Sequence, residues 1–126
     1  NFENINGTNN AGSANGGADV LSGNSGANQL NGQAGDDVLN GEGGNDILIG
    51  GAGSDTFTFE GNFGNDVIND FEVGIDRLDF SDFGDTFADQ IDVADVDSGT
   101  LLTLGDSGSV LLAGVNDFDF DDDFVS

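Results

Sequence analysis

Oxygen-bearing side chains recur every nine residues through the first half of this chain. Five consecutive nine-residue units occupy residues 14–58, and a sixth unit occupies residues 61–69. The sixth positions of these units are Asp19, Asn28, Asp37, Asp46, Asp55 and Asp66. Carboxylate and amide oxygens are the ligands that hard divalent cations such as Ca²⁺ prefer. The spacing therefore predicts a series of similar cation sites.

The charge balance indicates the same class of partner. The 126 residues include 25 Asp and Glu but a single basic residue, Arg77, and the formal net charge is -24. A nucleic-acid-binding surface needs Lys and Arg to contact phosphates, and an anionic membrane surface would repel this chain. We therefore expect no nucleic acid as a partner and no membrane insertion, and we expect divalent cations to neutralise the carboxylates.

The residue types that are absent exclude further classes of site. Without Cys or His, the chain has no disulfide, zinc finger or iron–sulfur site. No apolar run approaches the roughly 18 residues of a membrane span, and the Asn-rich start lacks the basic and apolar regions of a secretory signal peptide. Because Met is also absent, we expect a fragment or a processed form, with any export signal located elsewhere.

One large apolar residue stands at the eighth position of each unit. These residues are Leu21, Leu30, Leu39, Leu48 and Phe57. A spacing of nine would place successive members on opposite faces of a helix, which excludes a helical array. The β-favouring triplets at 20–22, 38–40 and 47–49 instead indicate very short strands separated by turns. If two units form one rung, Leu21, Leu39 and Phe57 stack on one wall, and Leu30 and Leu48 stack on the other.

The same stacking brings the sixth-position oxygens together along two edges. We expect Asp19, Asp37 and Asp55 along one edge, and Asn28 and Asp46 along the other. Without neutralisation these carboxylates would repel one another. A calcium ion between successive rungs removes the conflict, because it accepts about six to eight oxygens and binds backbone carbonyls as readily as carboxylates. Glycine permits the positive φ that lets a turn curl its carbonyls toward an ion.

The sequences GQAGDDVLN at 32–40, GEGGNDILI at 41–49 and GGAGSDTFT at 50–58 resemble the calcium-binding nonapeptide repeats of RTX proteins. This resemblance implies an all-β fold, a right-handed parallel β-roll with about three to five calcium ions in its turns. It assigns the metal ligands to the sixth-position side chains and to backbone carbonyls of the turns. Those carbonyls belong to Gly23, Ser25, Gly32, Ala34, Asp36, Gly41, Gly43, Asn45, Gly50 and Ala52. Asn28 supplies a neutral oxygen, so we expect a weak site there.

The pattern divides the chain into three expected regions. Residues 1–13 form a degenerate lead-in or a decayed repeat, and residues 14–69 form the β-roll. Two additional residues, Phe59 and Glu60, break the rung register. Residues 70–126 form a C-terminal cap, because the sequence DVINDFEVGIDRLDF at 66–80 resembles the segment that closes the roll in secreted RTX proteins.

A hairpin is expected inside the cap, since residues 100–104 and 110–115 flank the polar turn 105–109. We expect this hairpin to cover an open end of the roll. Phe83, Phe87 and Ile91 also have the spacing of a short helical face, although glycine at position 84 disfavours a helix.

The acidic, Phe-rich end of the chain, residues 117–126, resembles the C-terminal signal of type I secretion substrates. Alternating Phe and Asp is equally typical of an edge strand with one buried face. The two interpretations are compatible.

One short motif suggests catalysis and is rejected. Gly105-Asp106-Ser107-Gly108 matches the sequence around the nucleophile of chymotrypsin-like proteases. A serine nucleophile needs a base to accept its proton, and the chain contains neither His nor Lys. We interpret the motif as a turn, predict no catalytic residues and do not expect an enzyme.

The sequence thus favours a secreted module, extracellular or at the cell surface, that calcium folds and that is disordered without calcium. The resemblance implies two further partners, an upstream domain of the same polypeptide and the type I secretion machinery. One alternative is a structural surface protein, such as a surface-layer, adhesin or filament subunit, that self-associates when calcium binds. Another alternative is an accessory domain of a secreted protease, lipase or polysaccharide-modifying enzyme.

Overall fold

The computed structural model describes residues 3–6, 18, 20–23, 25–83 and 91–115. These residues form an all-β fold with one 3₁₀ helix at Ser81–Phe83. The strands are β1 (Glu3–Asn6), β2 (Val20–Ser22), β3 (Asn28–Asn31), β4 (Val38–Asn40), β5 (Ile47–Ile49), β6 (Thr56–Thr58), β7 (Gly64–Ile68), β8 (Arg77–Asp79), β9 (Ile91–Val96), β10 (Gly99–Leu104) and β11 (Gly108–Ala113). The expected strands at 20–22, 38–40 and 47–49 are confirmed. Among the described residues, no helix is long and apolar enough to span a membrane.

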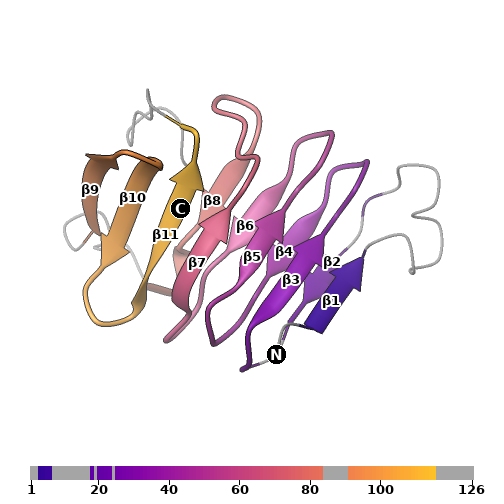
Figure 1. Ribbon diagram of the computed structural model, residues 1–126. Coiled ribbons are helices and arrows are strands. Elements are labelled where there is room, and N and C mark those ends of the chain that lie inside the picture. The colour runs from indigo at the N-terminus through magenta and orange to yellow at the C-terminus, as the bar shows by residue number, and fades with distance from the viewer. Residues whose placement is uncertain (1–2, 7–17, 19, 24, 84–90, 116–126) are drawn as a thin grey trace.

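Successive strands alternate between two sheets. Sheet A has the order β1-β3-β5-β7-β11-β10-β9, and sheet B has the order β2-β4-β6-β8. All pairings of β1 to β8 are parallel. Figure 1 shows the chain winding from one sheet to the other along the length of the molecule. This is the parallel β-roll that the resemblance implies, with two nine-residue units in each rung.

The register confirms the expected stacking of the apolar residues. Leu21 pairs with Leu39 and Leu39 with Phe57 in sheet B, while Leu30 pairs with Leu48 in sheet A. Beyond Phe59 and Glu60, Leu48 pairs with Ile68, 20 residues later. The two additional residues therefore change the spacing between rungs while the parallel pairing continues.

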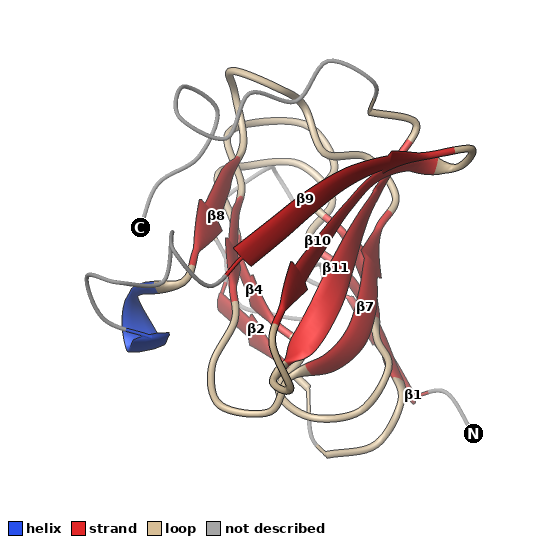
Figure 2. Cartoon of the chain, turned by 90° about the vertical axis from the view of Figure 1, so that its left-hand side faces the viewer, coloured by secondary structure: helices blue, strands red, loops and turns tan. Residues whose placement is uncertain are grey.

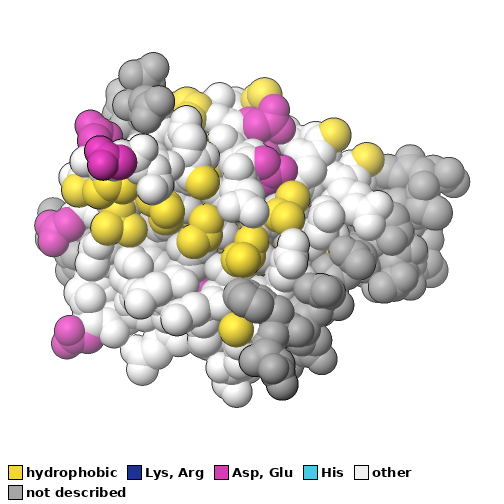
Figure 3. Space-filling model, viewed as in Figure 1, with side chains coloured by type: hydrophobic (Ala, Val, Ile, Leu, Met, Phe, Trp, Pro, Cys, Tyr) yellow, Lys and Arg dark blue, Asp and Glu magenta, His cyan; other side chains and the backbone are white. Residues whose placement is uncertain are grey.

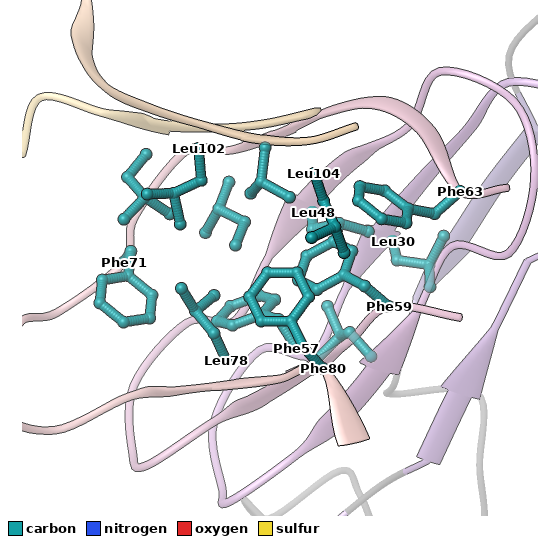
Figure 4. Close-up of a cluster of buried hydrophobic side chains, with 14 of the residues drawn as sticks. Leu30, Leu48, Phe57, Phe59, Phe63, Phe71, Leu78, Phe80, Leu102 and Leu104 are labelled. Carbon is teal, nitrogen blue, oxygen red and sulfur yellow. The ribbon is translucent and has the colours of Figure 1, made fainter. Parts of the chain in front are cut away.

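The space between the sheets is filled by the eighth-position residues and by a group of Phe rings. Leu30, Leu39, Leu48 and Phe57 are fully buried. Phe59, from the two-residue insertion, is also buried, and its ring lies 5.1 Å from Phe63 and 5.2 Å from Phe80 between centroids. Figure 4 shows these rings beside the aliphatic side chains of the roll. The insertion thus adds an aromatic core residue at the point where the repeats end.

The expected hairpin is present at the C-terminal end of the roll. Strands β10 and β11 are antiparallel, with Leu102 opposite Val110, and β11 continues sheet A by pairing parallel with β7. Leu102 and Leu104 belong to the buried core. Figure 2 shows β9 and β10 crossing the end of the roll that faces the viewer. The hairpin therefore covers that end, as expected.

The structure contradicts one prediction for the C-terminal region, and several other predicted positions lie outside the described residues. Ile91 begins strand β9, so the expected helical face is wrong at that position, because Ile91 pairs with Leu104 across the sheet. Phe87 lies outside the described residues, as do residues 117–126 and Asp19.

Ser107 lies in a turn, where its N–H donates to Leu104 O and its carbonyl accepts from Phe63 N, in keeping with the turn interpretation.

An apolar band crosses the outer face of sheet A. The register aligns Ile47 with Val67, Val67 with Leu111, and Leu111 with Leu101, and all four side chains are partly buried. Figure 3 shows apolar side chains gathered in a band on this face, with carboxylates beyond it. This row of the outer face of sheet A is therefore apolar from β5 to β10.

Candidate metal sites in the turns

The turns of the roll stack along two edges. On the first edge, the turn residues 25–27, 41–45 and 61–63 lead into sheet A and precede Asn28, Asp46 and Asp66. On the second edge, turns 32–36, 50–54 and 70–75 lead into sheet B and precede Asp37, Asp55 and Asp76. Backbone contacts join neighbouring turns of one edge, for example the hydrogen bond of 3.1 Å from Gly35 N to Ala52 O. Each edge therefore presents a column of Asp or Asn side chains.

Four of the five carboxylates in these columns, those of Asp46, Asp55, Asp66 and Asp76, are each fixed by a backbone N–H of the preceding rung. The Oδ1 atom of the later residue accepts a hydrogen bond from the N–H of the earlier one. The four bonds run from Asn28 N to Asp46 at 2.7 Å, from Asp37 N to Asp55 at 3.0 Å, from Asp46 N to Asp66 at 2.9 Å and from Asp55 N to Asp76 at 2.9 Å. Oδ1 of each of these carboxylates is thus held by the protein, and this hydrogen bond also sets the orientation of Oδ2.

The second oxygen is the feature that fits a cation. Asp46 and Asp55 are 1% and 0% exposed, and the Oδ2 atom of each is buried without a hydrogen-bond partner in the described part of the chain. A buried carboxylate oxygen without a partner is strongly unfavourable, and proteins satisfy such groups with counter-charges or metal ions. A Ca²⁺ ion bound at these oxygens would remove that penalty.

The first glycine of each unit makes room for this oxygen. A Cβ atom built on Gly41 or Gly50 would overlap the carboxylate of Asp46 or Asp55, respectively. A Cβ on Gly32 would lie 2.5 Å from Asp37 Oδ2 and 2.8 Å from Gly50 O. These glycines are thus required for space, whereas Gly51 and other glycines later in the turns supply the positive φ that the sequence predicts.

Burial also disfavours the ionised carboxylates when no cation is bound. Desolvation raises the pKa of Asp46 to about 6 and that of Asp66 to about 8, while the backbone hydrogen bond to each opposes the rise. It raises the pKa of Asp55 to about 7, and the nearby carboxylates of Asp76, Asp37 and Asp70 raise it further. A positive ion would stabilise the ionised forms of these groups.

The described residues include no group of three or more Asp, Glu, His or Cys side chains that converges as a metal site. The resemblance assigns backbone carbonyls of the turns as the further ligands. The structure places Gly50 O beside Asp37 and Gly41 O beside Asn28 across the first glycines of the turns. Ala52 O accepts a hydrogen bond from Gly35 N, and for the other carbonyls the ligand assignment stays a prediction.

Two acidic residues that complete the second edge, Asp70 and Asp76, are not among the ligands predicted from the sequence. Asp76 is 4% exposed and continues the column of Asp37 and Asp55. A signal for it exists, since Asp76-Arg77-Leu78 repeats the order of Asp37-Val38-Leu39. The spacing from Asp55 is 21 residues, and the longer turn hides the match. No comparable signal marks Asp70, which binds turn 50–54 through Gly50 N and Gly51 N.

The repeat region matches a family of calcium-binding repeats. The family model of the RTX calcium-binding nonapeptide repeat, which contains four copies, matches residues 6–34, 13–48 and 22–57. No curated protein matches the chain significantly. Among the solved structures, the chain is similar to the AlgE6R3 subunit of the Azotobacter vinelandii mannuronan C5-epimerase, with 26% identity and a TM-score of 0.32. That match covers 87% of this chain and 79% of the other.

Proposed function

Residues 6–57 of this chain belong to the RTX calcium-binding nonapeptide repeats, and from this premise we propose that the chain is a calcium-folded module of a secreted protein. The observation that carries the proposal is the pair of buried Oδ2 atoms of Asp46 and Asp55, which have no hydrogen-bond partner in the described residues. In the proposed module, calcium ions satisfy these oxygens and neutralise the columns along both edges.

The proposed ligands are the sixth-position side chains together with the turn carbonyls that the sequence analysis assigns. In the folded roll, the carboxylates of Asp46 and Asp55 are each oriented by a backbone hydrogen bond to one oxygen, and each directs the other oxygen into the turn, so folding assembles the ligands. About three to five ions fit the number of turns. We propose the β-roll at residues 14–69 and the cap at residues 70–126 as separate regions, although β8 of sheet B lies within the cap sequence.

Calcium binding and folding are one event in this proposal. The rung geometry that assembles the ligands exists only in the folded chain, so the free energy of ion binding contributes directly to folding. Affinities of roughly 10⁻⁴–10⁻³ M are typical of extracellular calcium modules. Such a chain is unfolded where calcium is scarce and folded where calcium is abundant.

This dependence suits a protein that crosses a secretion channel unfolded and folds outside the cell. The RTX repeats and the Phe-rich acidic end at 117–126 support this assignment. The proposed partners are calcium ions, an upstream domain of the same polypeptide and the type I secretion machinery. Removing residues 117–126 should abolish export; unchanged export would contradict the signal assignment.

Circular dichroism during a calcium titration tests the central proposal. We expect little β signal in excess chelator at neutral pH and a cooperative rise with calcium. Asp55→Asn keeps the acceptor for Asp37 N but removes a charge at the site, so it should shift the midpoint to higher calcium. Asp106→Asn removes the same charge from an exposed hairpin turn and is the matched control. A full β signal in chelator, or equal midpoints for both variants, would reject calcium-coupled folding.

Assembly between chains is a second candidate function. Strand β9 ends sheet A, and its Val93 and Val96 are 44% and 40% exposed. A terminal strand with apolar side chains is a template for pairing with another chain. Asp92 and Asp95 oppose such pairing by charge, and bound calcium would weaken this repulsion by lowering the net negative charge of the molecule. Light scattering with and without calcium distinguishes the two functions, since only a surface-layer, adhesin or filament subunit grows in mass.

A further inference from the structure

The loop at residues 70–75 occupies the place of a further turn on the second edge. Asp70 accepts hydrogen bonds from Gly50 N at 2.9 Å and from Gly51 N at 2.8 Å, one on each carboxylate oxygen. In the preceding rung, the N–H of the corresponding glycine, Gly32, donates to a backbone carbonyl, Ile49 O. The Asp70 side chain therefore takes the position of a carbonyl that a further repeat would supply.

Asp76 likewise takes the position of a sixth-position residue, but both of its oxygens are occupied by the protein. Its Oδ1 accepts from Asp55 N at 2.9 Å, and its Oδ2 accepts from Glu72 N at 2.8 Å. Asp55 differs, because its Oδ2 is buried without a hydrogen-bond partner in the described residues. In the repeats, the proposed ion binds Oδ2 of the Asp side chain. In Asp76, the corresponding Oδ2 instead accepts a hydrogen bond from Glu72 N.

The N–H groups at the end of the first edge bind a backbone carbonyl instead of carboxylates. There the hairpin turn supplies a backbone acceptor, because Ser107 O accepts from Phe63 N at 2.9 Å and from Gly64 N at 3.3 Å. Strand β11 then pairs with β7 beside Asp66. A solenoid must satisfy the N–H groups of its last rung, and this chain does so with a carbonyl on one edge and with two carboxylates on the other.

We propose that Asp70 and Asp76 are positioning residues that close the second edge without a metal ion, holding the last calcium turn in shape while binding no calcium themselves. The inference rests on the proposed calcium-coupled folding, because it states where the series of ions stops. Asp55 is then the last side-chain ligand of the second edge, and Asp76 supports it through its backbone N–H.

Calcium stoichiometry separates a closing residue from a ligand. Isothermal titration would compare the full chain with Asp76→Ala, Asp76→Asn and Asp55→Asn, and with Glu72→Gln as the matched control. Glu72 is exposed, and the variant removes one charge from the same loop while keeping the N–H that binds Asp76. We expect Asp55→Asn to lose an ion, and both Asp76 variants to keep the wild-type number. Loss of one ion in both Asp76 variants would overturn the proposal, because it would identify Asp76 as a ligand.

The calcium midpoint should move modestly in Asp76→Ala. An unsatisfied buried N–H at Asp55 disfavours folding, and because several ions bind together, the midpoint should rise only roughly two- to threefold. Glu72→Gln should leave it at or slightly above the wild-type value. A midpoint in Asp76→Ala equal to that of Glu72→Gln would contradict the positioning role.

Amide hydrogen exchange of the folded chain gives a readout that general loss of stability does not imitate. Asp76→Asn keeps one acceptor, so protection of the Asp55 amide should persist while that of Glu72 is lost; Asp76→Ala should lose both. Asp70→Ala should expose the amides of Gly50 and Gly51 alone. Uniform loss of protection throughout the roll would reject the local role. If the wild-type chain is folded in chelator, the proposed function fails, and the same exchange comparison still tests the closing role.

Discussion

The backbone N–H of Asn28 donates a hydrogen bond of 2.7 Å to Oδ1 of Asp46, which lies 18 residues later. This bond joins two rungs and also fixes the orientation of the Asp46 carboxylate, whose other oxygen is buried beside Gly41. Asn28 itself occupies a column whose later members are carboxylates, and it is 0% exposed. Among Asn28, Asp46 and Asp66, which follow one another along the first edge, Asn28 therefore supplies the neutral oxygen.

Replacing Asn28 by Asp should strengthen calcium binding on the first edge. The substitution is nearly isosteric and adds the charge that the other members of the column carry, so the calcium midpoint should fall about two- to fivefold. In chelator the same variant should be less stable, because a buried charge without an ion is unfavourable. A calcium titration followed by circular dichroism measures both effects.

Asn69→Asp is the control for this variant, because Asn69 is exposed at the end of β7. It adds the same charge at an exposed position outside the column of Asn28, Asp46 and Asp66. Equal midpoints in the two variants would show that Asn28 does not face an ion.

The space reserved by the first glycine of a unit gives a second prediction. A Cβ on Gly41 would overlap the Asp46 carboxylate, so Gly41→Ala should destabilise the calcium-loaded roll by roughly 1–3 kcal/mol. Gly43→Ala is a control in the same unit, because its Cβ would meet Ser25 at an ordinary 3.5 Å. Urea unfolding in saturating calcium would measure both. A loss of stability in Gly43→Ala as large as in Gly41→Ala would contradict a specific role for Gly41.

The sequence predicted the repeating half of the molecule well, because one local rule applies there many times. Leu30 and Leu48 pair as their spacing requires, and the strands at 20–22, 38–40 and 47–49 begin and end at the expected residues. The hairpin strands have other bounds than the expected 100–104 and 110–115, since β10 spans Gly99–Leu104 and β11 spans Gly108–Ala113. The sequence did not predict Asp76 as part of the column, because the turn before it is longer and the spacing to Asp55 becomes 21 residues. It also suggested a helical face that included Ile91, since local spacing cannot reveal that Ile91 pairs with Leu104. Beyond the nine-residue repeats, the conformation of each segment depends on tertiary contacts that the local sequence pattern does not reveal.

The raised pKa values predict how pH affects the calcium-free roll. Asp46, Asp55 and Asp66 have pKa values of about 6, about 7 and about 8 in the fold, above the ordinary value of 3.8. The folded state thus binds more protons than the unfolded state, and stability falls as pH rises. This stabilisation is complete below about pH 4 and is lost as pH rises through roughly 6 to 8. In chelator, we expect the β signal to increase as the pH is lowered from about 8 to about 5.

Calcium-induced folding should show the opposite pH dependence, because protons compete with the ion for the same carboxylates. Its midpoint should therefore rise at acid pH. Asp66→Asn removes the group with the highest of these pKa values and should flatten the pH dependence near neutral pH, whereas Asp106→Asn in the exposed hairpin turn should not. The proposed protonation would be excluded if both variants kept the wild-type slope.

The two-residue insertion provides the last prediction, because its members have different environments. Phe59 is 1% exposed between the rings of Phe63 and Phe80, whereas Glu60 is exposed and accepts one hydrogen bond from Asn40 Nδ2. Phe59→Ala should reduce the free energy of unfolding by about 3–5 kcal/mol through loss of buried area and formation of a cavity. Glu60→Ala should change it by less than about 1 kcal/mol, since a single exposed hydrogen bond contributes little. Because Phe59 joins the last repeat strand to the cap, Phe59→Ala should also lower the cooperativity of calcium-induced folding. Comparable effects of the two substitutions would mean that the insertion only lengthens the turn and does not anchor the cap to the roll.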